Sequence, residues 1–439
     1  MFKETSKELL DFLSKCPTAF HAVENYRQIL NADGFEELLE SEHWNIVPGG
    51  KYYVTRNNTS ILAFKVGTKL DNYSFNIVTS HTDSPTFKVK ENAEIEVKNK
   101  YTQLNTEGYG GMLCATWLDR PLSIAGRVLV SEGDSIVTKL LNIDRDLLMI
   151  PNVAIHMNRA ANDGFKYNLQ VDMLPLLSAG DDRQKDFKQI IADELGVKKE
   201  DILGHDLYLY NRMAPSIWGA NEEFISAGHL DDLQCGFASL KALLAGYNDE
   251  SIDIMACFDN EEVGSGTKQG ADSTLLRDTL TRINSALGKT EEDYHRALAS
   301  SFMLSADNAH AVHPNHPEHT DSTNCTYMNE GVVVKSHAGQ KYTSDGVSMA
   351  VVKALASGVE VPLQYFANRS DKAGGSTLGN IAMAQASMNA VDIGLPQLAM
   401  HSSYETAGIK DTYYAITLMK ALFDSHIQET STHSLEIKR

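Results

Sequence analysis

Residue types that bind metals stand directly after several short apolar segments of this chain, where a strand would end. They are His81, Glu261, Glu262, Asp307 and His401; a further acidic residue, Asp231, lies in a turn just before an expected helix. In an open α/β sheet, ligands collect beyond the carboxyl ends of the strands, so side chains placed there can converge on one edge. Histidine mixed with carboxylate suits Zn²⁺, Co²⁺ or Mn²⁺ better than Mg²⁺ or Ca²⁺. The sequence therefore predicts a transition-metal site assembled from distant segments.

A paired site is the form of metal centre that this set of residues can build. It needs one carboxylate shared by two ions roughly 3.5–4 Å apart, each ion also holding its own histidine and carboxylate. Any one of these residues alone could be a helix cap or a solvated polar side chain. Their recurrence after four apolar segments favours metal binding. The chain has no HExxH, GxSxG or Walker A motif, which removes three other catalytic architectures.

The elements that must position these residues can be read from hydrophobic periodicity. A helical pattern over 7–29 is interrupted at Cys16-Pro17, and a hairpin is expected from strands 51–55 and 60–66. Further apolar strands are expected near 75–80, 252–258, 302–304, 332–334 and 398. Helices are expected near 233–244, 275–287, 348–356, 380–389 and 413–423.

Strands alternating with helices predict an α/β fold with a mostly parallel, mixed sheet covered by helices. The stretch 91–220 differs, because it carries period-two segments with Gly and Asp turns. We expect a discontinuous domain of residues 1–90 and 221–439, with a β-rich domain of residues 91–220 inserted into it.

Net charge and cysteine content limit the kinds of partner and the cellular compartment that we expect. With 39 Lys and Arg against 58 Asp and Glu, the formal charge is −19, so neither nucleic acid nor an anionic membrane is an expected partner. Five cysteines without a CxxC pair argue against a disulfide framework. The N-terminus lacks the apolar run of a signal peptide. These features favour a cytoplasmic protein.

Five ordered segments resemble the aspartyl aminopeptidase family of dinuclear metallopeptidases. They are SHTDSP (80–85), GHLDDL (228–233), DNEEVGS (259–265), SADNAHAVHPNH (305–316) and QLAMHS (397–402). The resemblance covers nearly the whole chain, including the insertion, and implies a zinc-exopeptidase-like fold. It implies that His81 and Asp307 bind one metal, that Glu262 and His401 bind the other, and that Asp231 bridges the two.

The same resemblance assigns the remaining catalytic roles. Asp83 would fix the tautomer of His81, and Glu261 would be the general base for a water activated by the two metals. Two divalent ions per subunit are implied, zinc first and cobalt or manganese as alternatives. In similar proteins the insertion mediates dimerisation and sends a histidine into the neighbouring active site; the matching position here is His156. The family implies dimers assembled into a tetrahedral dodecamer that admits short peptides.

Substrate preference stays open between acidic and neutral N-terminal residues. Candidate cations for an acidic side chain are Lys335, Lys341 and Lys372, with Arg369 as a fourth. Against this, Gly339 falls where aspartate-preferring members tend to place a lysine, and Ala373-Gly374 replaces the Pro-Cys of another branch.

Histidines 310, 313, 316 and 319 form a cluster that could suggest a separate metal site. Prolines 314 and 317 exclude a regular helix, so the imidazoles cannot share a helical face, and we expect no separate metal site there.

The function that the sequence predicts is a metal-dependent aminopeptidase. The alternatives are a dinuclear dipeptidase or N-acyl amino acid deacylase, and a catalytically silent peptide-binding protein.

Overall fold

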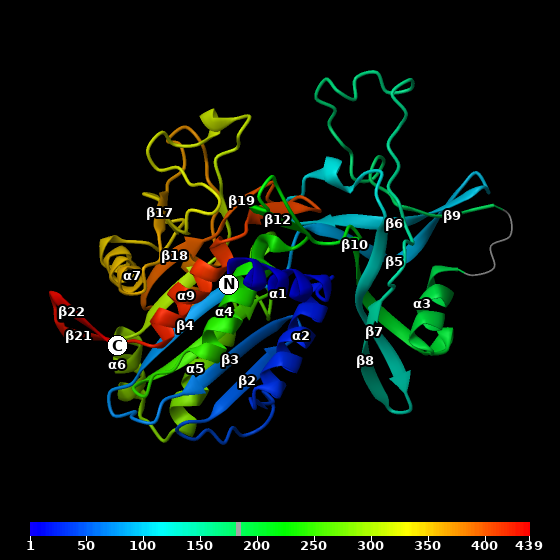
Figure 1. Cartoon of the computed structure of the whole chain (residues 1–439). Helices are drawn as coiled ribbons and strands as arrows, with labels where there is room; N and C mark the ends of the chain where they lie inside the picture. Colours follow the sequence, from blue (N-terminus) through cyan, green and yellow to red (C-terminus); the bar gives the residue numbers. More distant parts are fainter. Residues whose placement is uncertain (181–185) are drawn as a thin grey trace.

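A nine-stranded mixed sheet forms the centre of the molecule in the computed structural model, which describes residues 1–180 and 186–439 (Figure 1). In spatial order its strands are β1 (Glu36–Glu37), β2 (Lys51–Arg56), β3 (Ser60–Val66), β13 (Ser251–Phe258), β4 (Ser74–His81), β14 (Phe302–Ala306), β18 (Asn389–Gly394), β16 (Val332–Lys335) and β17 (Leu363–Phe366). The four strands β13, β4, β14 and β18 run parallel, whereas β2–β3, β3–β13 and β18–β16 are antiparallel pairs. The predicted fold class is confirmed.

Helices cover both faces of this sheet. One face packs against α1 (Phe2–Ser14), α2 (Ala19–Ala32), α4 (Leu230–Ala245), α7 (Gly346–Gly358) and α9 (Asp411–Phe423). The other packs against α5 (Leu275–Ala286), α6 (Glu291–Ala299) and α8 (Leu378–Gln385). Successive residues of β3 alternate between the two cores: Ile61 and Ala63 join the first, and Leu62 and Phe64 join the second. The sheet is therefore buried on both sides, as parallel strands require.

A second, antiparallel sheet lies beside the first (Figure 1). Its order is β8 (Ser135–Asn142), β7 (Leu122–Glu132), β10 (Ile202–Asn211), β5 (Thr86–Val97), β6 (Tyr101–Tyr109) and β9 (Leu176–Ala179), with α3 (Phe187–Leu195) against it. It has its own apolar core, in which the rings of Phe87 and Trp117 meet edge to face at 5.4 Å. These strands come from the segment that the sequence predicts to be β-rich; the division into domains at 91 and 220 stays a prediction.

A small five-stranded sheet connects the two. It is ordered β11 (Ser216–Trp218), β12 (Phe224–Ala227), β20 (Glu405–Gly408), β19 (Pro396–Leu398) and β15 (Ala309–His310). The chain ends in a hairpin of β21 (His426–Ser431) and β22 (Ser434–Lys438), and single 3₁₀ turns occur at η1 (Cys114–Trp117), η2 (Lys199–Asp201), η3 (Glu261–Val263) and η4 (Pro317–His319).

Several local predictions meet a clear outcome. The interruption at Cys16-Pro17 separates α1 from α2, and the hairpin turns through Asn57 and Asn58, both in the left-handed region with φ of 58°. The helix predicted over 380–389 is wrong at its end: α8 stops at Gln385, and residues from Asn389 form β18 in the centre of the sheet. The strand near Leu398 belongs to the small sheet.

All five cysteines lie in the described part of the chain and are free thiols. Among residues 1–180 and 186–439, none of the helices has the length and apolar character needed to span a membrane.

Gly126 tests the packing of the second sheet. It adopts a φ of +151° in β7, and a Cβ there would lie 2.0 Å from the carbonyl oxygen of Asp206 on the neighbouring strand. We expect Gly126→Ala to lower the free energy of unfolding by about 3 kcal/mol, because the ladder must open to admit the methyl group. Gly133→Ala is the control: its φ is +64° and nothing lies within 4 Å, so about 1 kcal/mol is expected. Urea unfolding measures both, and equal losses would contradict the packing argument.

Candidate metal centre

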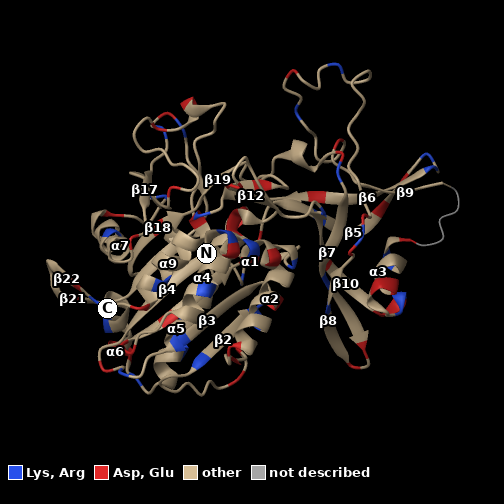
Figure 2. Ribbon diagram, in the orientation of Figure 1, with Lys and Arg blue, Asp and Glu red and all other residues tan. Residues whose placement is uncertain are grey.

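The predicted metal ligands come together where the central strands end. His81 is the last residue of β4, Asp307 follows β14, and Glu262 lies in η3, just after β13. Asp231 lies in the first turn of α4, and His401 follows β19 of the small sheet. Figure 2 shows acidic segments gathered in this region, near β12 and β19. Five segments far apart in the sequence thus converge, and the role of their side chains as metal ligands stays a prediction.

Their ligand atoms form two sets that share one residue. In the set His81, Asp231 and Asp307, and in the set Asp231, Glu262 and His401, all ligand atoms lie within 4.8 Å of one another. The shared carboxylate divides its oxygens: Oδ1 of Asp231 is 3.5 Å from Nε2 of His81, and Oδ2 is 3.6 Å from Nε2 of His401. Such an arrangement can hold two divalent ions with Asp231 between them.

The electrostatics of these residues fit cations. Asp231 Oδ1 and Glu262 Oε1 are buried and have no hydrogen-bond donor among the described residues. Burial, followed by the nearby Asp231 carboxylate, raises the pKa of Glu262 well above its usual value. A buried, unpaired carboxylate is costly, and a coordinated metal ion removes that cost. The donor set of imidazoles and carboxylates matches zinc.

Asp83 organises one side of the centre. Nδ1 of His81 lies 3.0 Å from the backbone oxygen of Asp83 and 3.4 Å from its carboxylate, so Nδ1–H donates there and Nε2 faces Asp231. The carboxylate of Asp83 also accepts the backbone N–H groups of Glu261 and Glu262 at 3.1 and 3.2 Å. It therefore fixes both glutamates of η3 relative to His81.

The segment after β6 contributes groups that sequence reasoning missed. The Tyr109 hydroxyl donates to Asp83 at 2.6 Å. The carbonyl oxygen of Gly111 lies 2.8 Å from Nδ1 of His401, and the backbone N–H of Leu113 donates to the His401 carbonyl at 2.9 Å. The ring of His401 is thereby oriented with Nε2 towards Asp231. Two of these groups belong to the backbone, and the residue type gives no indication that a backbone group will serve a site.

Glu405 is a second residue that the sequence did not single out. It is buried in β20, and its two carboxylate oxygens accept the backbone N–H groups of Asp231 at 2.9 Å and of His401 at 2.8 Å. One side chain thus sets the distance between the backbones of two candidate ligands. The only sequence signal was an acidic residue four positions after His401.

The remaining predicted residues lie in different surroundings. Lys335 is buried, with Nζ 3.5 Å from Asp307 Oδ1, and donates to the Asn308 carbonyl at 2.8 Å. Lys341 is exposed and donates to the Gly374 carbonyl at 2.9 Å. His156 is exposed on the loop between β8 and β9. Their roles towards substrate stay predictions.

Lys372 lines a cavity of about 250 Å³ beside the centre. Its walls include residues just after Asp307 and just before His401. Its polar lining comprises His310, His313, His319, Thr320, Asn368, Arg369, Lys372 and Gln397. In the part of the chain described, no group pairs with the Lys372 ammonium, whereas Arg369 is bound by Asp371 at 2.9 Å. An anionic side chain entering this cavity would meet unneutralised positive charge.

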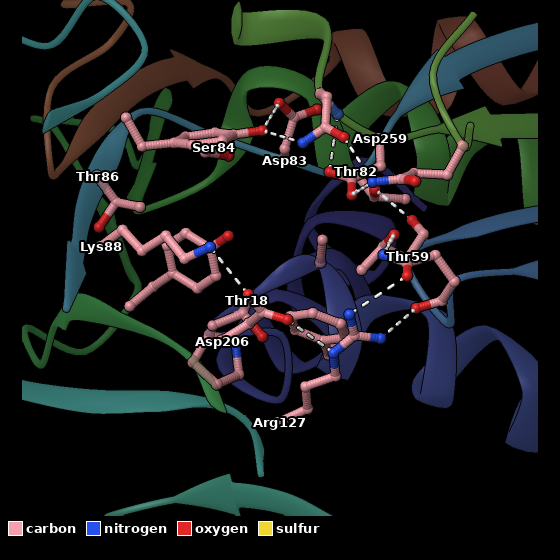
Figure 3. Close-up of a pocket in the computed structure, with 18 of the residues that line it drawn as sticks. Thr18, Thr59, Thr82, Asp83, Ser84, Thr86, Lys88, Arg127, Asp206 and Asp259 are labelled. Carbon is pink, nitrogen blue, oxygen red and sulfur yellow. Dashed lines mark hydrogen bonds and ion pairs between the residues drawn. The ribbon is translucent and has the colours of Figure 1, made fainter. Parts of the chain in front are cut away.

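A different cavity, of about 320 Å³, lies where Asp83 meets the second sheet (Figure 3). Two of its cations are already paired: Lys88 and Arg127 contact Asp206 at 2.8 and 2.9 Å. Arg127 also donates to the Asn57 carbonyl at 3.0 Å, which ties the second sheet to the β2–β3 turn.

The Glu405 contacts predict its effect on metal affinity. In Glu405→Gln the amide group can accept only one of the two backbone N–H groups, so Asp231 and His401 lose their fixed spacing. We expect metal affinity to fall about 10–100-fold, measured by competition with a chelator. Glu436→Gln, an exposed position in β22, is the matched control. Unchanged affinity in Glu405→Gln would show that this clamp is not needed.

Comparison with known proteins identifies the family of this chain. Residues 12–423 match the model of the family described as aminopeptidase I zinc metalloprotease (M18). The chain is 47% identical over 426 residues to "Probable M18 family aminopeptidase 2" of Clostridium novyi (strain NT), covering 95% of this chain and 98% of that protein. A chain in the cryo-EM structure of the Ape4 and Nbr1 complex is 34% identical, with a TM-score of 0.93 and coverage of 96% and 86%. The S. cerevisiae mApe1 dodecamer is 28% identical, with a TM-score of 0.83 and coverage of 96% and 97%. The chain belongs to the aminopeptidase I zinc metalloprotease (M18) family and is a metal-dependent aminopeptidase.

Proposed function

We propose that this aminopeptidase holds two zinc ions per subunit and removes an N-terminal Asp or Glu from short peptides. The observation that carries the two-ion assignment is the Asp231 carboxylate, whose two oxygens face two different imidazoles. His81 and Asp307 complete one donor set, and Glu262 and His401 complete the other. Cobalt or manganese could replace zinc, because the same donors suit those ions.

Bound divalent ions supply Lewis acidity to the scissile carbonyl and lower the pKa of the attacking water. Glu261 then serves as general base. Its ligand atom lies within 4.8 Å of those of His81 and Glu262, and Asp83 holds its backbone N–H. Burial raises the pKa of the Glu261 carboxyl to about 8, and nearby Asp307 and Asp83 add to the rise. From this position a carboxylate can take a proton from water and deliver it to the leaving amine.

The cavity beside the centre is proposed to receive the N-terminal side chain. Lys372 and Arg369 supply positive charge there. The wall residues also include segments that lie close in sequence to Asp307 and His401. Lys335 is proposed to act on Asp307 instead, because its ammonium is buried against that carboxylate. Lys341 remains an outer candidate at the surface. Acidic residues are favoured over neutral ones on these charges.

Assembly is proposed to follow that of the yeast relative, which forms a dodecamer. In this proposal dimers of the chain assemble into a tetrahedral dodecamer, and His156 reaches the active site of the partner subunit to stabilise the oxyanion. The loop between β8 and β9 supports a contact role, because His156 is flanked by exposed apolar side chains: Val153, Ile155 and Met157 are 52%, 44% and 82% exposed. The free thiols support a reducing, cytoplasmic location.

Glu261→Gln tests the assigned base. Glutamine keeps the size of the side chain and removes its basicity, so we expect metal content to be unchanged and kcat to fall about 10²–10⁴-fold. Metal analysis and steady-state kinetics measure the two quantities. Asp231→Ala is the contrasting variant, in which both metal and activity should be lost. Normal turnover in Glu261→Gln would reject this base.

A panel of Asp, Glu, Leu and Lys aminoacyl substrates tests specificity. We expect Asp and Glu to be preferred, and Lys372→Gln to reduce kcat/KM for them about tenfold, the worth of one charge-assisted hydrogen bond, without changing Leu turnover. Lys7→Gln, at an exposed site in α1, is the control. Preference for Leu would support neutral specificity. Cleavage of dipeptides alone would support the dipeptidase alternative, and peptide binding without turnover would support a silent protein.

A further inference from the structure

A cluster of possible ligands lies outside the metal centre. One ligand atom from each of His316, Glu318 and His319 lies within 4.8 Å of the other two, and all three residues are exposed. None belongs to the ligand sets formed by His81, Asp231 and their neighbours. The cluster occupies the loop between β15 and β16, at the η4 turn, which projects at the top left of Figure 1.

The sequence argument excluded this cluster only as the face of a regular helix. The loop instead makes two successive tight turns: the backbone N–H of His316 donates to His313 O at 3.0 Å, and that of His319 donates to His316 O at 3.2 Å. This spacing brings the rings into a row, with centroids 5.4 Å apart for His313–His316 and also for His316–His319. Histidines three residues apart therefore do meet without a helix.

The loop holds this arrangement before any ligand arrives. Pro314 and Pro317 restrict the backbone, and the Thr320 hydroxyl donates to the Pro317 carbonyl at 2.8 Å. The guanidinium of Arg369 donates to the Glu318 carbonyl oxygen. Little conformational entropy remains to be lost on binding, which favours affinity.

The chemistry of the cluster suits a transition metal. Nδ1 of His316 lies 3.1 Å from Oε1 of Glu318. Ligand atoms around tetrahedral zinc lie about 3.3 Å apart, given zinc–ligand distances near 2.0–2.1 Å. Two imidazoles and one carboxylate fill three positions and leave a fourth for water, the pattern of an open site.

We propose that His316, Glu318 and His319 form a separate, exchangeable binding site for zinc, distinct from the metal centre. His319 also lines the 250 Å³ cavity together with His313, Arg369 and Lys372. An ion bound at this site occupies the His319 imidazole, which then no longer serves as a lining group for an incoming side chain. Excess zinc therefore slows peptide hydrolysis without displacing the ions of the centre; this consequence rests on the proposed function of the cavity.

Zinc binding to the assembled, metal-loaded enzyme tests the site. The variant is His316→Ala with His319→Ala. The control is His295→Ala with His433→Ala, which removes two exposed imidazoles elsewhere. Equilibrium dialysis against zinc should show one equivalent per subunit fewer in the variant than in wild type and control. This difference is independent of how many ions the centre holds. Equal zinc binding in variant and wild type would overturn the proposal.

Two further readouts separate the site from its effect. Copper added to the same proteins should give an electron paramagnetic resonance signal with nitrogen splitting from histidine, and the variant should lose that component while the control keeps it. Titrating zinc during peptide hydrolysis should lower the rates of wild type and control relative to their own rates without added zinc, whereas the rate of the variant, relative to its own zinc-free rate, should not fall. A copper component that persists in the variant would overturn the site. Equal inhibition of all three proteins would overturn its effect on the cavity and leave the proposed aminopeptidase function intact.

Discussion

The placement of one buried carboxylate, Asp231, determines what the rest of the site can do. It lies between the Nε2 atoms of His81 and His401, at 3.5 and 3.6 Å, and is shared by both donor sets. A carboxylate in so dry a place is stable only with charge-compensating partners. The fold brings these partners to Asp231, which lies in the first turn of α4: His81 is the last residue of β4, and His401 follows β19.

The second sheet takes part in this arrangement. Tyr109, at the end of β6, binds Asp83, and the next residues hold His401 through the Gly111 carbonyl and the Leu113 amide. Each donor set therefore includes a histidine whose orientation depends on this sheet, through Asp83 for His81 and directly for His401. A contact that shifts the second sheet, such as one made on assembly, would change the orientation of His81 and His401 through these hydrogen bonds.

Much of the site could be predicted because the chemistry is carried by side chains at strand ends. His81 ends β4, Asp307 directly follows β14, and Glu262 lies in the short turn after β13, so a pattern of an apolar segment followed by a ligand was sufficient. Glu405 was missed because it acts through backbone amides of residues remote in sequence. The carbonyl of Gly111 was missed for the related reason that a backbone atom has no residue signature.

The secondary structure also divides into elements that the sequence predicts and elements that it does not. The hairpin of β2 and β3 and most of the predicted helices follow their hydrophobic periods, whereas β18 was not predicted: the expected helix ran to Asn389, where this strand begins. Its pattern is broken by Asp392, which is buried and accepts hydrogen bonds from Ser305, Thr343 and Thr377. A polar residue in the middle of a central strand interrupts the apolar pattern from which a strand is predicted. Its hydrogen-bond partners lie far away in the sequence, so the sequence does not show that it can be buried.

The balance of charge links metal binding to folding. Around Asp231 the fold buries the carboxylates of Asp232, Asp307 and Glu405 and the side chain of Glu262, whereas among the described residues the one buried ammonium is that of Lys335. Burial raises the pKa of Glu405 and of Glu262 well above their usual values, so the folded environment disfavours the ionised form of both groups. A divalent ion held by Glu262 and its neighbours would offset that cost, and its binding free energy would add to stability because the unfolded chain lacks the site. The metal centre is therefore the part of the fold whose stability depends most on bound ions.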